Sequence, residues 1–191
     1  MTIQQDLITP NNFSRSQEPL TDVRGLVLHW VASPGQLADE TRDYFEMRKN
    51  GKLGYGSAHF IVGLNGEIVQ CIPTNEVAFH VGSSQPDPAS GKIYTDLCRA
   101  KLGAGNPNYR TIGIEHNHTD WSGKFEDSTL HASVQLAAKL CLDFKLDPLT
   151  QIFIHQQIVG WKQCPLWFVN HPSDLNEYRQ LVAILCKTLK R

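Results

Sequence analysis

The chain has 191 residues, of which 41% are hydrophobic and 19% are charged, and its formal net charge is −1. This length suits one domain that buries a core without disulfides. The balanced charge gives no basic surface for nucleic acid or for an anionic membrane. No apolar run approaches the ~20 residues that a transmembrane helix needs. We therefore expect a globular domain with no nucleic-acid partner and no membrane insertion. The oligomeric state stays open.

The first residues and the cysteines bear on where the chain is made. Residues 1–6 lack the basic and apolar stretches of a secretory signal, so we expect synthesis in the cytoplasm without a signal peptide. The five cysteines are odd in number and irregularly spaced, which argues against a disulfide framework. Cys141 and Cys186 lie in apolar helical patterns and are expected in the core.

The first half of the chain predicts an arm followed by alternating strands and a helix. Residues 1–22 are polar and are expected to wrap a domain formed by residues 23–191. The apolar run 24–30 predicts a buried strand that ends in a histidine. Helical spacing predicts a helix over residues 36–49. The runs 57–63 and 67–72 flank Asn65-Gly66 and predict a hairpin, and residues 78–82 predict a short strand or its exit.

The second half completes an α/β pattern. Residues 83–108 form a long irregular connection around a helix predicted over 94–101, and such connections usually carry function or move. Residues 111–118 predict a strand, and Asp127 or Ser128 is expected to cap a long helix that follows it. A short strand over 151–154 and a helix from Pro172 follow. The order predicts one α/β domain with a mixed central sheet flanked by helices.

A metal site is the strongest chemical hypothesis. His155 and Cys164 offer an imidazole and a thiolate, which both suit zinc. Their separation is too long for one helix face, but a loop can fold both onto one ion. His29 is the best third ligand, because it ends a core strand far away in the sequence. Three protein ligands leave the fourth position open for water, as catalytic zinc requires.

Two further residues complete a hydrolytic arrangement. Alternation along 111–118 puts Glu115 on the face opposite Ile112 and Ile114, beside Gly113, where an apolar setting raises the pKa of a base that later acts as an acid. Lys162 lies two residues before Cys164 and can stabilise an oxyanion. Simpler alternatives remain at this point. Glu115 could sit in a buried ion pair and Lys162 could be exposed. His80 or His59 could close the fourth position and make a zinc site structural.

Five ordered motifs within residues 24–165 resemble the zinc-dependent type 2 N-acetylmuramoyl-L-alanine amidases, which include phage lysins and peptidoglycan recognition proteins. The matching segments are Leu28-His29-Trp30, Ser57–Val62 with Asn65-Gly66, Ala78–Gly82, Thr111–Glu115, and His155 through Lys162-Gln163-Cys164-Pro165. Each motif alone is weak, and their shared order makes the resemblance specific. Some family members carry Tyr where this chain has Ala58, so no role for a tyrosine is implied at that position.

The resemblance implies a zinc amidase catalytic domain over residues 23–191. It implies one Zn²⁺ held by His29, His155 and Cys164, with Glu115 as the catalytic carboxylate and Lys162 as the oxyanion stabiliser. His80 is expected in the substrate cleft, and His59 either packs in the sheet or contacts substrate. The implied reaction hydrolyses the amide between N-acetylmuramic acid and L-alanine in peptidoglycan or a muropeptide.

The resemblance alone does not say to which branch of the family the chain is most similar. A cysteine as the third ligand favours the lysin-like or recognition-protein branch, because the cytosolic recycling and lipoprotein branches of the family look like they use Asp at that position. A bacteriolytic, endolysin-like enzyme of this kind is expected to act on the cell wall after release by a route that the chain does not encode. The alternatives are a muropeptide-binding module without catalysis and a cytosolic amidase that recycles anhydro-muropeptides.

Overall fold

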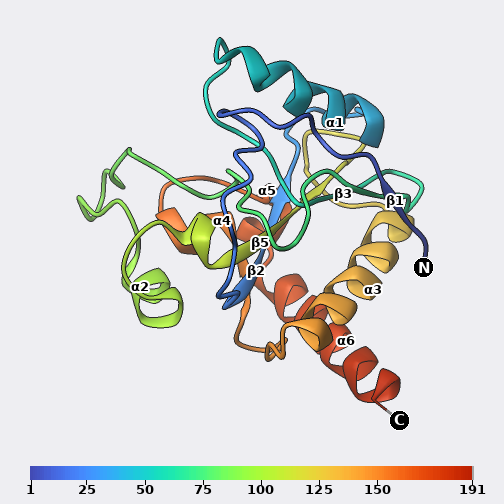
Figure 1. Ribbon diagram of the computed structural model, residues 1–191. Helices are drawn as coiled ribbons and strands as arrows, with labels where there is room; N and C mark the ends of the chain where they lie inside the picture. The colour runs from blue at the N-terminus through green and yellow to red at the C-terminus, as the bar shows by residue number, and fades with distance from the viewer. Residues whose placement is uncertain (191) are drawn as a thin grey trace.

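A mixed sheet forms the centre of the protein in the computed structural model, which describes residues 1–190 (Figure 1). In these residues the sheet has six strands in the order β1-β4-β3-β5-β2-β6. The four strands β3, β5, β2 and β6 are all parallel to one another. At the other end of the sheet, β4 is antiparallel to β3, and β1 pairs with β4 in parallel. Their bounds are β1 Ile3–Gln5, β2 Gly25–Trp30, β3 Phe60–Val62, β4 Ile68–Gln70, β5 Thr111–His116 and β6 Ile152–Ile154. The predicted α/β class with a mixed sheet is confirmed.

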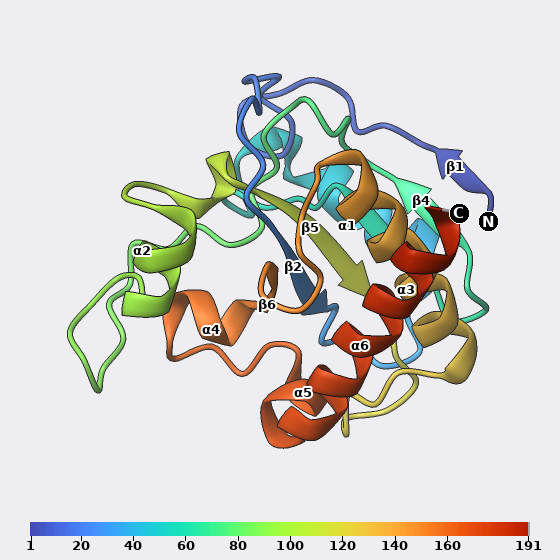
Figure 2. The same cartoon turned by 90° about the horizontal axis from the view of Figure 1, so that it is seen from below.

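Helices cover both faces of this sheet (Figures 1 and 2). They are α1 Ala38–Met47, the 3-10 helix η1 Arg48–Asn50, α2 Asp96–Leu102, the 3-10 helix η2 Pro107–Tyr109, α3 Asp127–Asp143, α4 His155–Val159, α5 Leu166–Asn170 and α6 Pro172–Leu189. Figure 2 shows α3 and α6 side by side, and these two helices pack on one face of the sheet. None of the helices within residues 1–190 has the length and apolarity to cross a membrane.

Alternation along the central strands separates the two faces. Leu26 and Leu28 of β2 point toward α3 and α6, and they join the largest apolar cluster together with Ile112 and Ile114 of β5. The residues between them point to the other face, where apolar cover is divided in two. One cluster places α1 over β3 and β4, and another places α2 and α4 over β2 and β6. The part of this face between the two clusters carries the candidate site.

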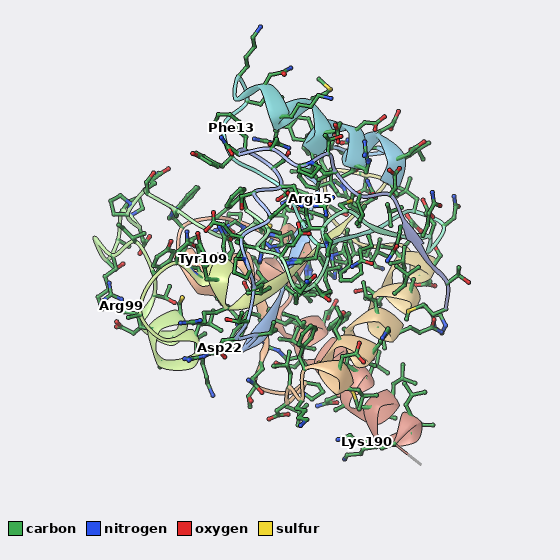
Figure 3. The ribbon with its side chains drawn as sticks, in the orientation of Figure 1. Phe13, Arg15, Asp22, Arg99, Tyr109 and Lys190 are labelled. Carbon is green, nitrogen blue, oxygen red and sulfur yellow. The ribbon has the colours of Figure 1, made fainter. Side chains whose placement is uncertain are left out.

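The first 22 residues contribute more to the fold than an external arm. Residues Ile3–Gln5 pair with β4 and extend the sheet by one strand, which the polar sequence did not predict. Ile8 is completely buried among side chains of α1, β3 and β4. Arg15 forms two hydrogen bonds of 2.8 Å with the carboxylate of Glu76. Figure 3 shows the side chains of Phe13 and Arg15 on the path of this segment below α1.

Several element predictions are confirmed, and four need correction. The hairpin of β3 and β4 is present, as are helices in the predicted 36–49 and 94–101 windows. Residues 78–82 form no strand, because backbone N–H groups there bond to a side chain instead of to a neighbouring strand. The N-cap of α3 is Glu126 rather than Asp127 or Ser128. Residues 155–159 form the short helix α4 rather than a loop, and α5 was not predicted.

We predict that Ile8→Ala destabilises the whole domain, because it leaves a cavity in an apolar cluster shared with the sheet. The expected loss is about 2–4 kcal/mol in the free energy of unfolding, measured by urea denaturation. Ile93→Ala is the matched control, since Ile93 is 39% exposed, and it should change stability by less than ~0.5 kcal/mol. Equal stability of the two variants would show that residues 1–22 are a dispensable arm.

Candidate metal centre

Parallel strand register brings the predicted site residues together. His29 of β2 lies directly beside Glu115 of β5, so both side chains leave the same face of the sheet. On the other side of β2, Leu28 pairs with Ile154 of β6. The chain turns into α4 at the next residue, His155, which therefore starts beside His29. The carboxyl ends of neighbouring parallel strands are where open α/β sheets place their ligands.

Three potential metal ligands converge at this edge. The ligand atoms of His29, His155 and Cys164 all lie within 4.8 Å of one another. Nδ1 of His29 is 3.0 Å from Nδ1 of His155 and 3.7 Å from Sγ of Cys164. Tetrahedral zinc with the usual bond lengths places two nitrogens ~3.3 Å apart and a nitrogen and a sulfur ~3.6 Å apart. The donor set and its spacing fit one zinc ion.

Burial sets the protonation states of these ligands. It lowers the pKa of His29 well below its ordinary value, with the neighbouring His155 as the next cause. Burial, and after it the charge of Lys162, lower the pKa of His155 to about 3. Both imidazoles are therefore neutral at pH 7, as metal ligation requires. Burial and then the carboxyl of Glu115 raise the pKa of the Cys164 thiol to about 12, so a bound cation must displace its proton.

Glu115 lies beside the ligands and lines a cavity. The cavity has a volume of about 700 Å³, and Glu115, His155 and Lys162 all line it. Oε2 of Glu115 is buried and has no hydrogen-bond partner within residues 1–190. Burial raises the pKa of this carboxyl to about 8, although the charge of Lys162 acts to lower it. No ion pair holds Glu115 among the described residues, so the alternative of a buried ion pair is not supported.

His59 has no atom left for a substrate. It is completely buried, its Nε2 lies 3.0 Å from the carbonyl oxygen of Glu76, and its Nδ1 accepts a hydrogen bond from the backbone N–H of Gly113. Of the two expectations for His59, these contacts favour packing in the sheet over contact with substrate.

His80 lines the cavity, but its ring nitrogens face protein atoms. Nδ1 of His80 lies 3.0 Å from Nε2 of His29, and Nε2 of His80 faces the carbonyl and hydroxyl oxygens of Thr111. Its Nδ1 therefore meets the edge of the His29 ring that is turned away from His155 and Cys164. Neither His80 nor His59 closes the fourth position beside the three ligands, so a purely structural zinc site is not favoured.

Sequence patterns did not identify several residues that shape the site. Asn108 comes from the irregular segment 83–108, and its Oδ1 accepts hydrogen bonds from three successive backbone N–H groups, those of residues 80–82. His116 approaches from the opposite face and bonds the carbonyl oxygen of His29 at 2.7 Å. The aromatic rings of Tyr44 and Tyr55 line the cavity and are 43% and 67% exposed. The spacing of Tyr44 and Tyr55 in the sequence does not predict that both line the same cavity.

Comparison with known proteins agrees with this geometry. The sequence pattern described as N-acetylmuramoyl-L-alanine amidase matches residues 19–167. The N-acetylmuramoyl-L-alanine amidase BlyA of Bacillus subtilis (strain 168) is 32% identical over 175 residues, which cover 92% of this chain and 45% of BlyA. CwlL of Bacillus licheniformis, an amidase with the same description, is 28% identical over 188 residues, 96% of this chain and 47% of CwlL. The chain thus spans about half the length of these curated relatives.

Solved structures share the fold. The structure of PlyL superposes with a TM-score of 0.70 at 17% sequence identity, covering 95% of this chain and 97% of PlyL. The catalytic domain of XlyA gives a TM-score of 0.67 at 21% identity, covering 94% of this chain and 99% of that domain. Fold and site together define an α/β domain with a group of potential metal ligands, His29, His155 and Cys164, at its parallel strand ends. The chain belongs to the N-acetylmuramoyl-L-alanine amidase family.

We predict that Glu115→Gln stabilises the metal-free protein at high pH. Because the pKa of Glu115 is raised to about 8, the folded protein retains a proton that the unfolded chain releases above pH ~4.5. Stability from this group is therefore complete below pH ~4.5 and is lost as the pH rises through 8. In the presence of a chelator, the variant should unfold a few degrees above the wild type at pH 9, and this advantage should shrink toward pH 5.

The control for this measurement is Glu177→Gln, which changes an exposed carboxylate on α6. Its unfolding temperature should follow the wild type at every pH. Parallel curves for Glu115→Gln and the wild type between pH 5 and 9 would contradict the assignment of a buried, protonated carboxyl.

Proposed function

We propose that this chain is a zinc-dependent amidase that hydrolyses the bond between the lactyl group of N-acetylmuramic acid and L-alanine in peptidoglycan. One observation carries the proposal. His155, which belongs to the ligand group with His29 and Cys164, lines the same cavity as Glu115 and Lys162. Membership of the amidase family supports the choice of bond. We assign one zinc ion to the three ligands, and we assign residues 23–191 to the catalytic domain.

Held by His29, His155 and Cys164, a zinc ion would supply Lewis acidity for the attacking water and for the carbonyl of the scissile amide. The role of Glu115 is to move the proton. Its carboxylate accepts a proton from the attacking water, and it then donates that proton to the leaving nitrogen of L-alanine. Glu115 belongs to β5, whose backbone is paired with β2 on one side and with β3 on the other. Positive charge beside this carboxyl, from Lys162 and from a bound cation, would lower its pKa from about 8 and make the basic form more available.

Lys162 supplies positive charge without being a ligand. It is exposed, lines the cavity, and lies close enough to Glu115, His29 and His155 to lower the pKa of each. In the reaction its ammonium group stabilises the oxyanion that develops when water adds to the amide carbonyl. The proton balance is complete within the site, because the proton that Glu115 removes from water returns on the leaving amine.

We predict that Glu115→Ala and Lys162→Ala each lower kcat while the protein stays folded. The expected losses are about 10²–10⁴-fold for Glu115→Ala, as a general acid–base residue, and about 10²–10³-fold for Lys162→Ala, as an oxyanion stabiliser. The measurement is the appearance of new L-alanine amino termini from purified peptidoglycan. His131→Ala removes an exposed histidine of α3 and should keep full activity. Full activity of the Glu115 and Lys162 variants would disprove their roles.

We predict that Cys164→Ser loses both bound zinc and activity, because a serine hydroxyl replaces the thiolate that zinc prefers. A chelator should abolish wild-type activity, and added Zn²⁺ should restore it. Metal content is read by atomic emission on the purified protein. Chelator-resistant activity, or a Cys164→Ser variant that keeps its zinc, would contradict the proposal.

The products distinguish this proposal from its alternatives. Mass spectrometry of digested peptidoglycan should reveal free stem peptides that begin with L-alanine. Unchanged fragments that remain bound to the protein would indicate a binding module, which the presence of Cys164 disfavours. Activity on soluble anhydro-muropeptides but not on intact sacculi would indicate a recycling enzyme. Walls that contain diaminopimelate or lysine at the third stem position, digested in parallel, give the peptide preference.

A further inference from the structure

The imidazole of His29 is held at both nitrogens. Its Nδ1 faces His155 and Cys164, where the proposed zinc binds. Its Nε2 lies 3.0 Å from Nδ1 of His80, and the two rings meet edge to face with an interplanar angle of 85°. The second nitrogen of a metal-bound histidine usually donates to an oxygen acceptor, and that bond fixes its tautomer. Here another histidine occupies the acceptor position.

The partners of His80 determine which of its nitrogens carries a hydrogen. Nε2 of His80 lies 3.3 Å from the carbonyl oxygen of Thr111 and 3.2 Å from its Oγ1. The carbonyl oxygen can only accept. The hydroxyl already donates its hydrogen to the carbonyl oxygen of Pro107 at 2.8 Å, so toward His80 it can also only accept. Nε2 of His80 must therefore be the donor.

The donor role of Nε2 of His80 also determines which nitrogen of His29 carries a hydrogen. With its hydrogen on Nε2, a neutral His80 has a lone pair on Nδ1, which accepts from Nε2–H of His29. His29 then has its own lone pair on Nδ1, the atom that faces His155 and Cys164. The reverse direction requires hydrogens on both nitrogens of His80, and hence an unpaired positive charge on a ring that is only 9% exposed.

The structure fixes the position of the His80 ring as well as its tautomer. Gly113 of β5 lies beneath it, and a Cβ at Gly113 would lie 2.5 Å from Cγ of His80, so only glycine leaves room for the ring. Oδ1 of Asn108 accepts from the backbone N–H groups of His80, Val81 and Gly82 at 3.1, 2.8 and 3.1 Å. A strand could not hold the segment this way, because its N–H groups would alternate in direction.

We propose that His80 is a positioning residue for the metal centre: it accepts the Nε2 hydrogen of His29 and thereby presents the Nδ1 lone pair of His29 to the zinc ion. This replaces the expected role of His80 as a substrate contact. The inference rests on the proposed zinc site, but it concerns affinity for the ion and makes no use of the reaction. Zinc binding by the wild type tests the site, and the variants below test His80.

The experiment compares two substitutions whose side chains have the same branched shape and four non-hydrogen atoms each. Asn at position 80 keeps an acceptor oxygen in the place of Nδ1, whereas Leu puts a methyl group there. The dissociation constant for Zn²⁺ is measured by competition with a chromogenic chelator in the absence of substrate. His80→Leu should bind Zn²⁺ about 10–100-fold more weakly than the wild type. His80→Asn should stay within about threefold of it, on the same principle.

The matched control is His59→Asn, which replaces a fully buried histidine whose ring centroid is 5.8 Å from that of His80 and which is not hydrogen-bonded to His29. It should lower the unfolding temperature of the metal-free protein and leave zinc affinity unchanged. Equal zinc affinity of His80→Leu and the wild type would overturn the proposal. So would an equal loss in His80→Asn and His80→Leu, because the acceptor would then have no effect. A wild type that binds no zinc would instead refute the proposed metal site.

A second measurement needs no variant. Nitrogen-15 NMR of the histidine-labelled, zinc-loaded full chain distinguishes the two tautomers of each ring. We expect His80 with its hydrogen on Nε2 and His29 with its hydrogen on Nε2. A hydrogen on Nδ1 of His80 would overturn the proposal even if His80→Leu did not fold.

Discussion

The parallel register of β2, β5 and β6 is the constraint on which the site depends. It sets His29 beside Glu115 and delivers His155 at the end of the neighbouring strand. A shift of one residue in any of these strands would turn its site residue toward α3 and α6 and into the apolar cluster. The leucine and isoleucine side chains on that face therefore do more than stabilise the fold, because their burial fixes the register that aligns the polar face.

The part of the sheet that carries the site, between the two smaller apolar clusters, lacks the apolar contacts that an ordinary core provides. Imidazoles, a thiol and a carboxyl stand there, and burial disfavours the charged form of each. Apolar clusters on either side support this region. Proteins commonly tolerate such local instability where chemistry requires it. The second layer around His29 follows the same logic, since His80, Thr111 and Asn108 convert an otherwise unsatisfied polar region into a connected set of hydrogen bonds.

The sequence predicted those parts of the site that depend on strands. Alternation in 111–118 gave the orientation of Glu115, and a histidine at the end of an apolar run gave His29, since both follow from a two-residue period. The pairing of His80 with His29 was not predictable, because it depends on the conformation of loops that carry no period. Asn108 lay unnoticed in an irregular segment for the same reason. The edge strand β1 was missed because its exposed glutamines hide its alternation, and α4 and α5 were missed because five residues are too few for a helical pattern.

The place of β6 at the edge of the sheet has a consequence for the order of folding. His29 and His155 are 126 positions apart, and they meet only when β6 has joined β2. Pairing over such a span requires closure of a long loop, which is slow compared with the formation of helices and hairpins. Cys164 follows β6, so the complete ligand set does not exist on a nascent chain until most of the domain has been synthesised. At the proposed zinc site, capture of the ion would thus be a late event that follows completion of the sheet, and it would stabilise only the finished domain.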